Sequence, residues 1–208
     1  MKITKLVHSC LLVETADRTA LFDPGVMSTV PIDTLTKLDD IVITHGHSDH
    51  FDLDLVKRLT TRFPDTHITA PDEVVTQLNS ESIPATSAAS SGIAFFDSPH
   101  QAVYPIMATE PQELGIHYLD QLSHPGDSHS FHETKAILAL PVQAPWGSSV
   151  DAVLLALKLK PKYVIPIHDW HWRDEVRESM YIRMQQIFDE QGMTFISAVN
   201  GEAFTINL

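Results

Sequence analysis

The chain has 208 residues, of which 43% are hydrophobic and 20% charged, and this balance suits a single compact domain over residues 1–208. Its formal net charge of −13 at pH 7 has the wrong sign for binding nucleic acid through phosphates, and it also disfavours anionic membrane surfaces. No apolar run approaches the roughly 20 residues of a membrane span, and the N-terminus does not read as a signal peptide. The single cysteine, Cys10, excludes an internal disulfide. We therefore expect a cytoplasmic protein.

The first part of the chain predicts strands followed by two helices. Residues 2–23 read as strands, with a hairpin whose two apolar runs flank a polar corner at 14–18. A short strand at 41–43 runs directly into a histidine-rich segment. Apolar residues at helical spacing predict a helix over 52–62, and a second, short helix opens at Pro71-Asp72 and carries Val74, Val75 and Leu78.

The second part alternates strands and helices again. Residues 79–91 are rich in Ser and Ala and read as a surface loop, and Ser148-Ser149 offers an N-cap for a helix. A long helix near the C-terminus is expected to bury a stripe of Val176, Met180, Met184 and Ile187, and a final hairpin with the turn Asn200-Gly201 joins strands at 194–199 and 202–207. The other expected strands are 93–97, 102–107, 114–122, 135–140 and 163–165.

Two short segments of the chain resemble each other. Residues 41–45 and 164–168 are both apolar strands that end in histidine and lead into a helix. This similarity suggests two pseudo-equivalent halves. Because strands outnumber helices and helices occur in both halves, sheets covered by helices are the natural layering.

The segment 45–50 carries metal-ligand side chains at four of six consecutive positions. His45 and His47 lie two positions apart at the end of a strand, where extended backbone places both imidazoles on one side. Asp49 and His50 follow after a turn. A polar loop that held histidines by chance would rarely gather four ligand types without Lys or Arg between them, so the pattern predicts a metal site.

The motif His45-x-His47-x-Asp49-His50 resembles the signature of the metallo-β-lactamase-fold metal-dependent hydrolase superfamily. Candidates for the remaining ligands follow the order of that pattern along the chain, in the segments Leu21-Phe22-Asp23-Pro24-Gly25, Asp97-Ser98-Pro99-His100, His124-Pro125-Gly126-Asp127-Ser128 and Ile165-Pro166-Ile167-His168. Within the superfamily the chain is similar to the ascorbate-phosphate-lactonase-like branch, on Val7-His8-Ser9-Cys10, Leu122-Ser123-His124-Pro125-Gly126-Asp127 and Ala144-Pro145-Trp146.

This resemblance implies an α/β (α+β) fold, a four-layer αββα sandwich of the metallo-β-lactamase type with metals at one rim of the sheets. It also implies two divalent metal ions, for which nitrogen and oxygen ligands suit Zn²⁺ best, with Mn, Fe or Ni as alternatives. Asp49 and Asp127 would be the catalytic carboxylates, and Asp23 would fix a ligand histidine through a hydrogen bond. The implied ligands are His45, His47 and His100 for one ion, Asp49, His50 and His168 for the other, and Asp127 bridging both.

The implied activity is hydrolysis of a small ester, lactone or phosphoester. Two ions about 3.5–4 Å apart lower the pKa of a shared water to about 7, and the bridging hydroxide attacks a substrate whose oxygen a metal polarises. The alternatives are a single-iron dioxygenase or other redox member of the fold, a nuclease-like phosphodiesterase, which the charge of −13 disfavours, and a degenerate member without turnover. We expect a small-molecule substrate and no nucleic-acid or membrane partner, and the sequence does not indicate an oligomeric state.

Several assignments have rivals in the sequence. His168 could be a buried core histidine, and His129 and His132 read as parts of a solvated loop, although a histidine of the cluster 124–132 could protonate the leaving group. The rivals of His100 are His67, His117 and His124, those of Asp127 are Asp97 and Asp120, and the candidates to line the substrate site are His8, His124 and Trp146.

Overall fold

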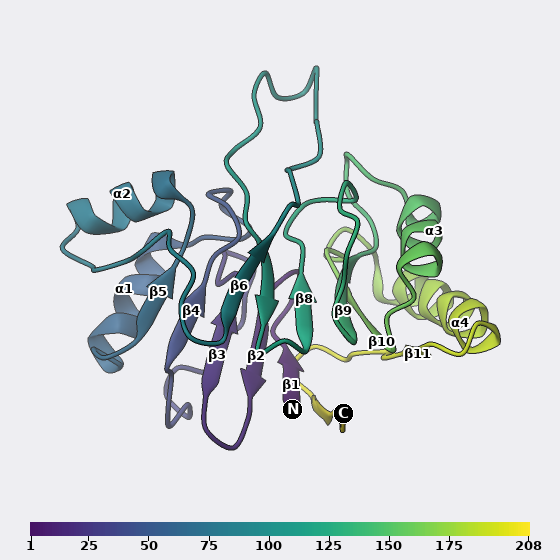
Figure 1. The fold of residues 1–208 in the computed structure, drawn as a ribbon, viewed down its shortest axis with the longest axis horizontal. Helices are drawn as coiled ribbons and strands as arrows, with labels where there is room; N and C mark the ends of the chain where they lie inside the picture. Colours follow the sequence, from purple (N-terminus) through teal and green to yellow (C-terminus); the bar gives the residue numbers. More distant parts are fainter. The chain divides into compact units, whose positions relative to one another are not determined.

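The computed structural model describes all 208 residues, Met1–Leu208, and they form two compact units. The first unit comprises Met1–Ala89 and Val199–Leu208, and the second comprises Ser90–Ala198. Each unit contains one six-stranded mixed sheet and two of the four helices (Figure 1). The expected α/β class is therefore present in both, and the expected domain over 1–208 contains two units.

The sheet of the first unit has the strand order β12-β1-β2-β3-β4-β5. Strands β12 to β3 pair antiparallel, which confirms the expected hairpin as β2 and β3, whereas β3, β4 and β5 are parallel. Parallel strands end at the same edge of a sheet, and the segments that follow β3 and β4 there carry Asp23 and the histidine-rich motif. The strand bounds are β1 Lys2–Lys5, β2 Leu11–Glu14, β3 Thr19–Phe22, β4 Asp40–Val42, β5 His67–Thr69 and β12 Ala203–Thr205.

The two helices of the first unit, α1 (Leu53–Arg62) and α2 (Asp72–Ser80), confirm the predicted ones. The side chain of Asp52 caps α1, because it accepts hydrogen bonds from the backbone N–H groups of the first turn. Apolar side chains on one face of each helix join the core of the sheet; they are Leu55, Val56 and Leu59 from α1 and Val74 and Leu78 from α2.

The sheet of the second unit has the order β11-β10-β9-β8-β7-β6. Strands β8 to β11 are parallel, and β6, β7 and β8 pair antiparallel. The segments similar in sequence occupy β4 and β10, each of which has parallel neighbours on both sides. The bounds are β6 Ile93–Phe96, β7 Gly115–Tyr118, β8 Leu122–His124, β9 Ile137–Pro141, β10 Tyr163–Ile167 and β11 Thr194–Phe195.

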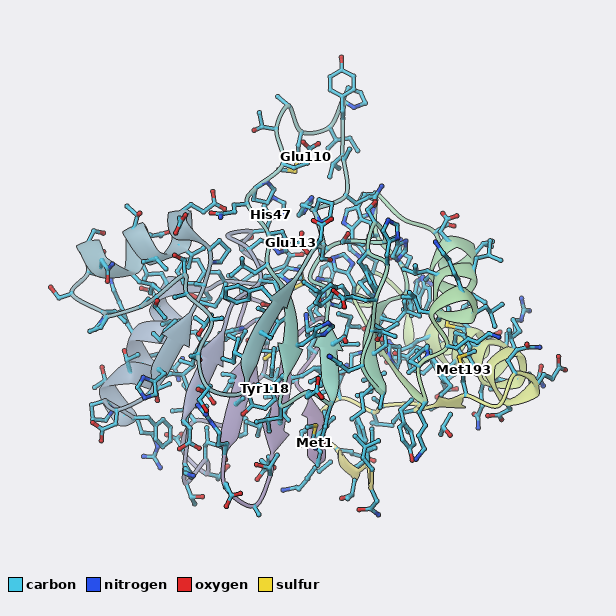
Figure 2. All side chains as sticks on the ribbon, in the orientation of Figure 1. Met1, His47, Glu110, Glu113, Tyr118 and Met193 are labelled. Atoms are coloured by element: carbon cyan, nitrogen blue, oxygen red, sulfur yellow. The ribbon has the colours of Figure 1, made fainter.

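Two strand predictions in this unit are wrong. Residues 102–107 form no strand but belong to a long loop that extends beyond the ends of β6 and β7 (Figure 1), and Glu110 lies on this loop (Figure 2). The apolar side chains of this loop do not pack on a sheet, since Tyr104 is 80% and Ile106 76% exposed. Pro105 also has no backbone N–H to donate to a neighbouring strand. The single strand expected over 114–122 is two strands, β7 and β8, separated by a tight turn.

The helices of the second unit are α3 (Ser149–Leu159), which Ser148 caps as predicted, and α4 (Asp174–Glu190). The predicted core stripe of α4 is confirmed at Met184, which is buried, and at Met180, which packs against the core, but it is wrong at its two ends. Val176 and Ile187 are exposed, and the buried face consists of Tyr181, Met184 and Phe188. A tyrosine can occupy this face because its hydroxyl has a buried hydrogen-bond partner, which a count of apolar residues does not detect. No helix has both the length and the apolar character to cross a bilayer.

The predicted C-terminal hairpin is also wrong. β11 extends the second unit's sheet by pairing with β10, whereas β12 extends the first unit's sheet by pairing with β1. The turn at Asn200-Gly201 is present, with Gly201 at a φ of 83°, but it connects strands of two different sheets. Each strand satisfies the backbone groups of an existing sheet edge, which local sequence patterns do not reveal.

Candidate metal centre

The histidine-rich loop after β4 brings potential metal ligands together within the first unit; His47 on this loop is labelled in Figure 2. His45 Nε2 lies 3.1 Å from His47 Nδ1, and the rings of His45 and His50 are 4.1 Å apart. Two nitrogens bound to one tetrahedral zinc ion lie about 3.3 Å apart. The His45–His47 pair therefore fits a shared metal ion.

A buried carboxylate, Asp23, organises the ligands behind this loop. Its oxygens accept hydrogen bonds from the Thr44 backbone N–H at 2.8 Å, from Thr44 Oγ1 at 2.9 Å and from His50 Nδ1 at 2.7 Å. Because Thr44 Oγ1 donates to Asp23, it is placed to accept from His45 Nδ1, which is 3.1 Å away. With Nδ1 engaged in both rings, Nε2 is the nitrogen that His45 and His50 would each present to a metal ion.

The turn after β3 braces the same loop. The Val26 backbone N–H donates to Ser48 O at 2.8 Å, and the Asp52 N–H donates to Pro24 O at 3.0 Å. A Cβ on Gly25 would lie only 2.0 Å from the carbonyl oxygen of Asp49, so only glycine permits this close approach. The run Asp23-Pro24-Gly25 thus supports the ligand loop with its backbone as well as with a carboxylate.

His8 lies beside Asp49 in the first unit. His8 Nε2 is 3.0 Å from Asp49 Oδ2, and one ligand atom each from His8, Asp49 and His50 fall within 4.8 Å of one another. The imidazole is almost fully buried, with His8 1% exposed. The sequence offers His8 as a candidate to line the substrate site or as a core residue, and nothing in it indicates a pairing across a separation of 41 positions.

The second unit contributes a second set of ligand atoms around Asp127. Asp127 Oδ2 lies 3.1 Å from His168 Nε2 and 3.9 Å from His100 Nε2, which suits a carboxylate shared between metal ions. The opposite nitrogens are anchored by backbone carbonyls, His168 Nδ1 at Gln143 O (2.7 Å) and His100 Nδ1 at Gln101 O (2.8 Å). Trp146 Nε1 also donates to Asp127 Oδ2 at 3.1 Å. Asp127 and His168 follow the carboxyl ends of the parallel strands β8 and β10.

The alternative candidates for His100 and Asp127 are exposed or make different contacts. Asp120 is exposed and paired with Lys135 Nζ at 2.6 Å, and His117 is buried against Ser123 Oγ at 2.9 Å. His124 is buried, and its Nδ1 accepts a hydrogen bond of 3.3 Å from the Gly126 N–H. His67 and Asp97 are exposed.

The interpretation of His129 as merely solvated is wrong. Its Nε2 donates to Pro141 O at 2.8 Å, its ring lies 5.1 Å from that of Trp146, and burial lowers its pKa. His132 is exposed, as expected of a solvated loop. The fixed ring of His129 therefore belongs to the support of Trp146, which in turn contacts Asp127.

A buried network next to His168 was missed by sequence reasoning. Asp169 is 1% exposed, accepts a hydrogen bond from Tyr181 Oη at 2.5 Å and forms an ion pair with Arg177, whose Nε lies 2.9 Å from its Oδ2. Burial and the nearby Asp169 carboxylate raise the pKa of Tyr181, so its hydroxyl stays a donor. The available signal was the i, i+4 spacing of Arg177 and Tyr181 on a helix that follows an acidic residue.

Residues 2–168 match the family model described as a beta-lactamase superfamily domain. The chain belongs to this superfamily. The match covers the histidine-rich motif and ends on His168, so it includes every residue of the two ligand sets. It confirms the metallo-β-lactamase resemblance on which the ligand assignment depends.

The relatives of this chain include proteins named metal-dependent hydrolases. Protein Rv0786c of Mycobacterium tuberculosis is 28% identical over 90% of this chain and 92% of its own length. The UPF0173 metal-dependent hydrolase NEQ378 of Nanoarchaeum equitans is 27% identical over 83% and 85%. Igni18, a metallo hydrolase of Ignicoccus hospitalis, has a TM-score of 0.71 at 19% identity over 99% of both chains. The expected fold and the expected class of metal-dependent hydrolase are confirmed.

Proposed function

We propose that this enzyme hydrolyses a small ester, lactone or phosphoester at a centre of two divalent ions, with zinc as the best match to its ligands. One ion binds His45, His47 and His100, the other binds Asp49, His50 and His168, and Asp127 bridges them. A lone buried thiol, Cys10, suits a reducing compartment, so we place the enzyme in the cytoplasm.

One observation carries this proposal. Potential ligand atoms converge, and the other ring nitrogen of the same histidines is held by a hydrogen bond. In the first unit His45 and His47 converge, while Asp23 and Thr44 hold the rear nitrogens of His50 and His45. In the second unit Asp127 meets two imidazoles whose rear nitrogens are held by backbone carbonyls. Metal-binding histidines characteristically donate their other N–H in this way, whereas solvated histidines have no need of such partners.

When bound, two divalent ions supply a water of lowered pKa and polarise the oxygen of the scissile group. The side chains of this chain set the conditions for that chemistry. Asp49 and Asp127 offset part of the positive charge, and the indole N–H of Trp146 fixes the orientation of Asp127. Cys10 is 2% exposed and burial raises the pKa of its thiol, so a cysteine nucleophile takes no part.

The charge of the chain favours a small substrate over a nucleic acid. Two divalent ions would return only about +4 against a formal charge of −13, so a polyanion would still be repelled. A substrate the size of a lactone or a phosphate monoester is attracted by the local charge of the ions and experiences less of this repulsion.

The proposal is tested by metal analysis combined with a substrate panel. Plasma mass spectrometry of the purified protein should find two ions per chain, and the zinc-reconstituted enzyme should turn over at least one class among lactones, carboxylic esters, phosphomonoesters and phosphodiesters. One iron per chain with oxygen-dependent turnover would instead favour the redox alternative. No metal and no turnover would overturn the proposal.

Asp127→Asn should lower kcat/KM on the best panel substrate by more than about 100-fold, because an amide is a poor bridging ligand. Asp120→Asn is the matched control: it changes an exposed carboxylate on the same unit and should stay within about twofold of the wild type. Wild-type turnover in the Asp127 variant would contradict the bridging role.

A further inference from the structure

His8 stands out as a buried imidazole aimed at a proposed metal ligand. It lies in the turn between β1 and β2, and its Nε2 is 3.0 Å from Asp49 Oδ2, a hydrogen-bonding distance. His50 Nε2 lies farther from the same oxygen, at 3.8 Å. The Asp49 side chain is 23% exposed, so His8 approaches it from the protein interior.

The backbone around His8 adopts an unfavourable conformation that gives the ring this direction. Val7 and His8 have φ values of 73° and 54°, in the left-handed region that β-branched residues such as Val7 rarely enter. Hydrogen bonds hold the turn in this form, from Leu6 N–H to Cys10 O at 2.8 Å and from Thr29 N–H to Leu6 O at 3.1 Å. Such conformations persist only where the surrounding structure enforces them, and they concentrate at functional sites.

We propose that His8 is a positioning residue for Asp49, an inference that rests on the proposed function. Its Nε2–H donates to one carboxylate oxygen and thereby fixes the rotamer of Asp49, so that the carboxylate binds its ion in a single orientation. A charge-assisted hydrogen bond of this kind is about twice as strong as a neutral one. His8 is therefore assigned to the support of the metal site rather than to the metal or the substrate.

The test measures metal affinity, by competition of zinc between the protein and a chelating dye. His8→Leu removes the donor and should weaken binding of one of the two ions by about 10- to 100-fold. His8→Gln places an amide N–H near the position of Nε2 and should restore affinity to within about threefold of the wild type. His117→Leu is the matched control, since it removes another buried, hydrogen-bonded histidine that touches none of the proposed ligands; its zinc affinity should match that of the wild type.

The outcomes separate this inference from the proposed function. Wild-type protein that binds no zinc would overturn both, whereas wild-type affinity in His8→Leu would overturn only the role of His8. Loss of one ion in both His8→Leu and His8→Gln would make the imidazole itself a ligand and would also overturn the positioning role. If His8→Leu does not fold, His8→Asn carries the same comparison, because its shorter amide does not reach the place of Nε2. Thermal unfolding of the metal-free variants, compared with metal-free wild type, shows whether a lower affinity is only a loss of stability.

Discussion

His117 shows how burial and fixed partners set the protonation of one side chain. Ser123 Oγ accepts a hydrogen bond from the Lys135 N–H at 2.7 Å, so its own hydrogen is available to His117 Nδ1 at 2.9 Å. The ring also stacks on Phe96, with centroids 4.3 Å apart. Burial, with help from the Lys135 charge, lowers the pKa of His117 from 6.5. The folded protein therefore favours the neutral ring.

This lowered pKa predicts a pH-dependent contribution to stability. The unfolded chain takes up a proton at His117 near pH 6.5, whereas the folded chain does so only at a lower pH. The contribution is therefore fully present above pH 6.5 and is lost as the pH falls toward the folded pKa. The free energy of unfolding, measured by urea denaturation at several pH values, should fall less steeply below pH 6.5 in His117→Asn than in the wild type. Parallel pH profiles for the two proteins would contradict the lowered pKa.

At this scale, the sequence revealed residues that are close along the chain and missed those that only folding brings together. His45, His47, Asp49 and His50 could be identified because they occupy one strand end and one turn. The contact of His8 with Asp49 could not, because no local pattern indicates which turn faces which loop. The same holds for His129, whose carbonyl partner belongs to another strand.

Among the elements, helix α4 contacts the residue that follows His168, one of the proposed metal ligands. The residue after His168 is Asp169, and α4 supplies its carboxylate with a hydrogen bond from the Tyr181 hydroxyl and, one turn earlier, an ion pair with Arg177. Because Asp169 is buried, these two partners replace the water that would otherwise solvate its charge. The docking of α4 and the position of the strand end that carries His168 are thus coupled.

Tyr181→Phe should lower the free energy of unfolding by about 1.5–3 kcal/mol, because it removes a hydrogen bond to a buried charge and leaves the ring in place. Tyr104→Phe is the control on an exposed tyrosine and should change stability by no more than about 0.5 kcal/mol. Urea denaturation followed by circular dichroism measures both. Equal stabilities for the two variants would show that the hydroxyl of Tyr181 contributes nothing to the docking of α4.

The elements themselves were predictable where local sequence determines them. Helices α1, α2 and α3 follow from apolar spacing, supported in α3 by an N-cap serine, and β2 and β3 follow from two short apolar runs. The predictions failed where a partner decides the outcome. The buried face of α4 depends on Asp169, and the last two strands pair with different sheets rather than with each other.

For the whole molecule, the proposed metal ions would link metal binding to folding. Ions that bind only the folded chain stabilise it by mass action, by about 2.7 kcal/mol at a free concentration 100-fold above Kd. The dinuclear proposal therefore predicts that metal ions stabilise the folded chain.

Zinc should raise Tm by roughly 5–10 °C over the chelator-treated protein, given the usual shift per kcal/mol for a chain of this size. Differential scanning fluorimetry measures the shift, and hydrogen exchange should show added protection both around His45 and around Asp127. Asp127→Asn should show a clearly smaller rise. Added protection around only one of these two residues would contradict the proposed ligand set.

One edge of the first unit depends on the far end of the chain. β12 pairs with β1, and the Met1 amino group donates to Ile206 O at 2.9 Å, although the whole second unit intervenes in the sequence. During translation the backbone N–H and C=O groups of β1 that pair with β12 therefore lack this partner strand until residues 203–205 have been made. The first unit begins to emerge from the ribosome before the second, yet it is the later one to acquire all its strands. Until then, β1 is an open edge strand at which the nascent chain is exposed to mispairing.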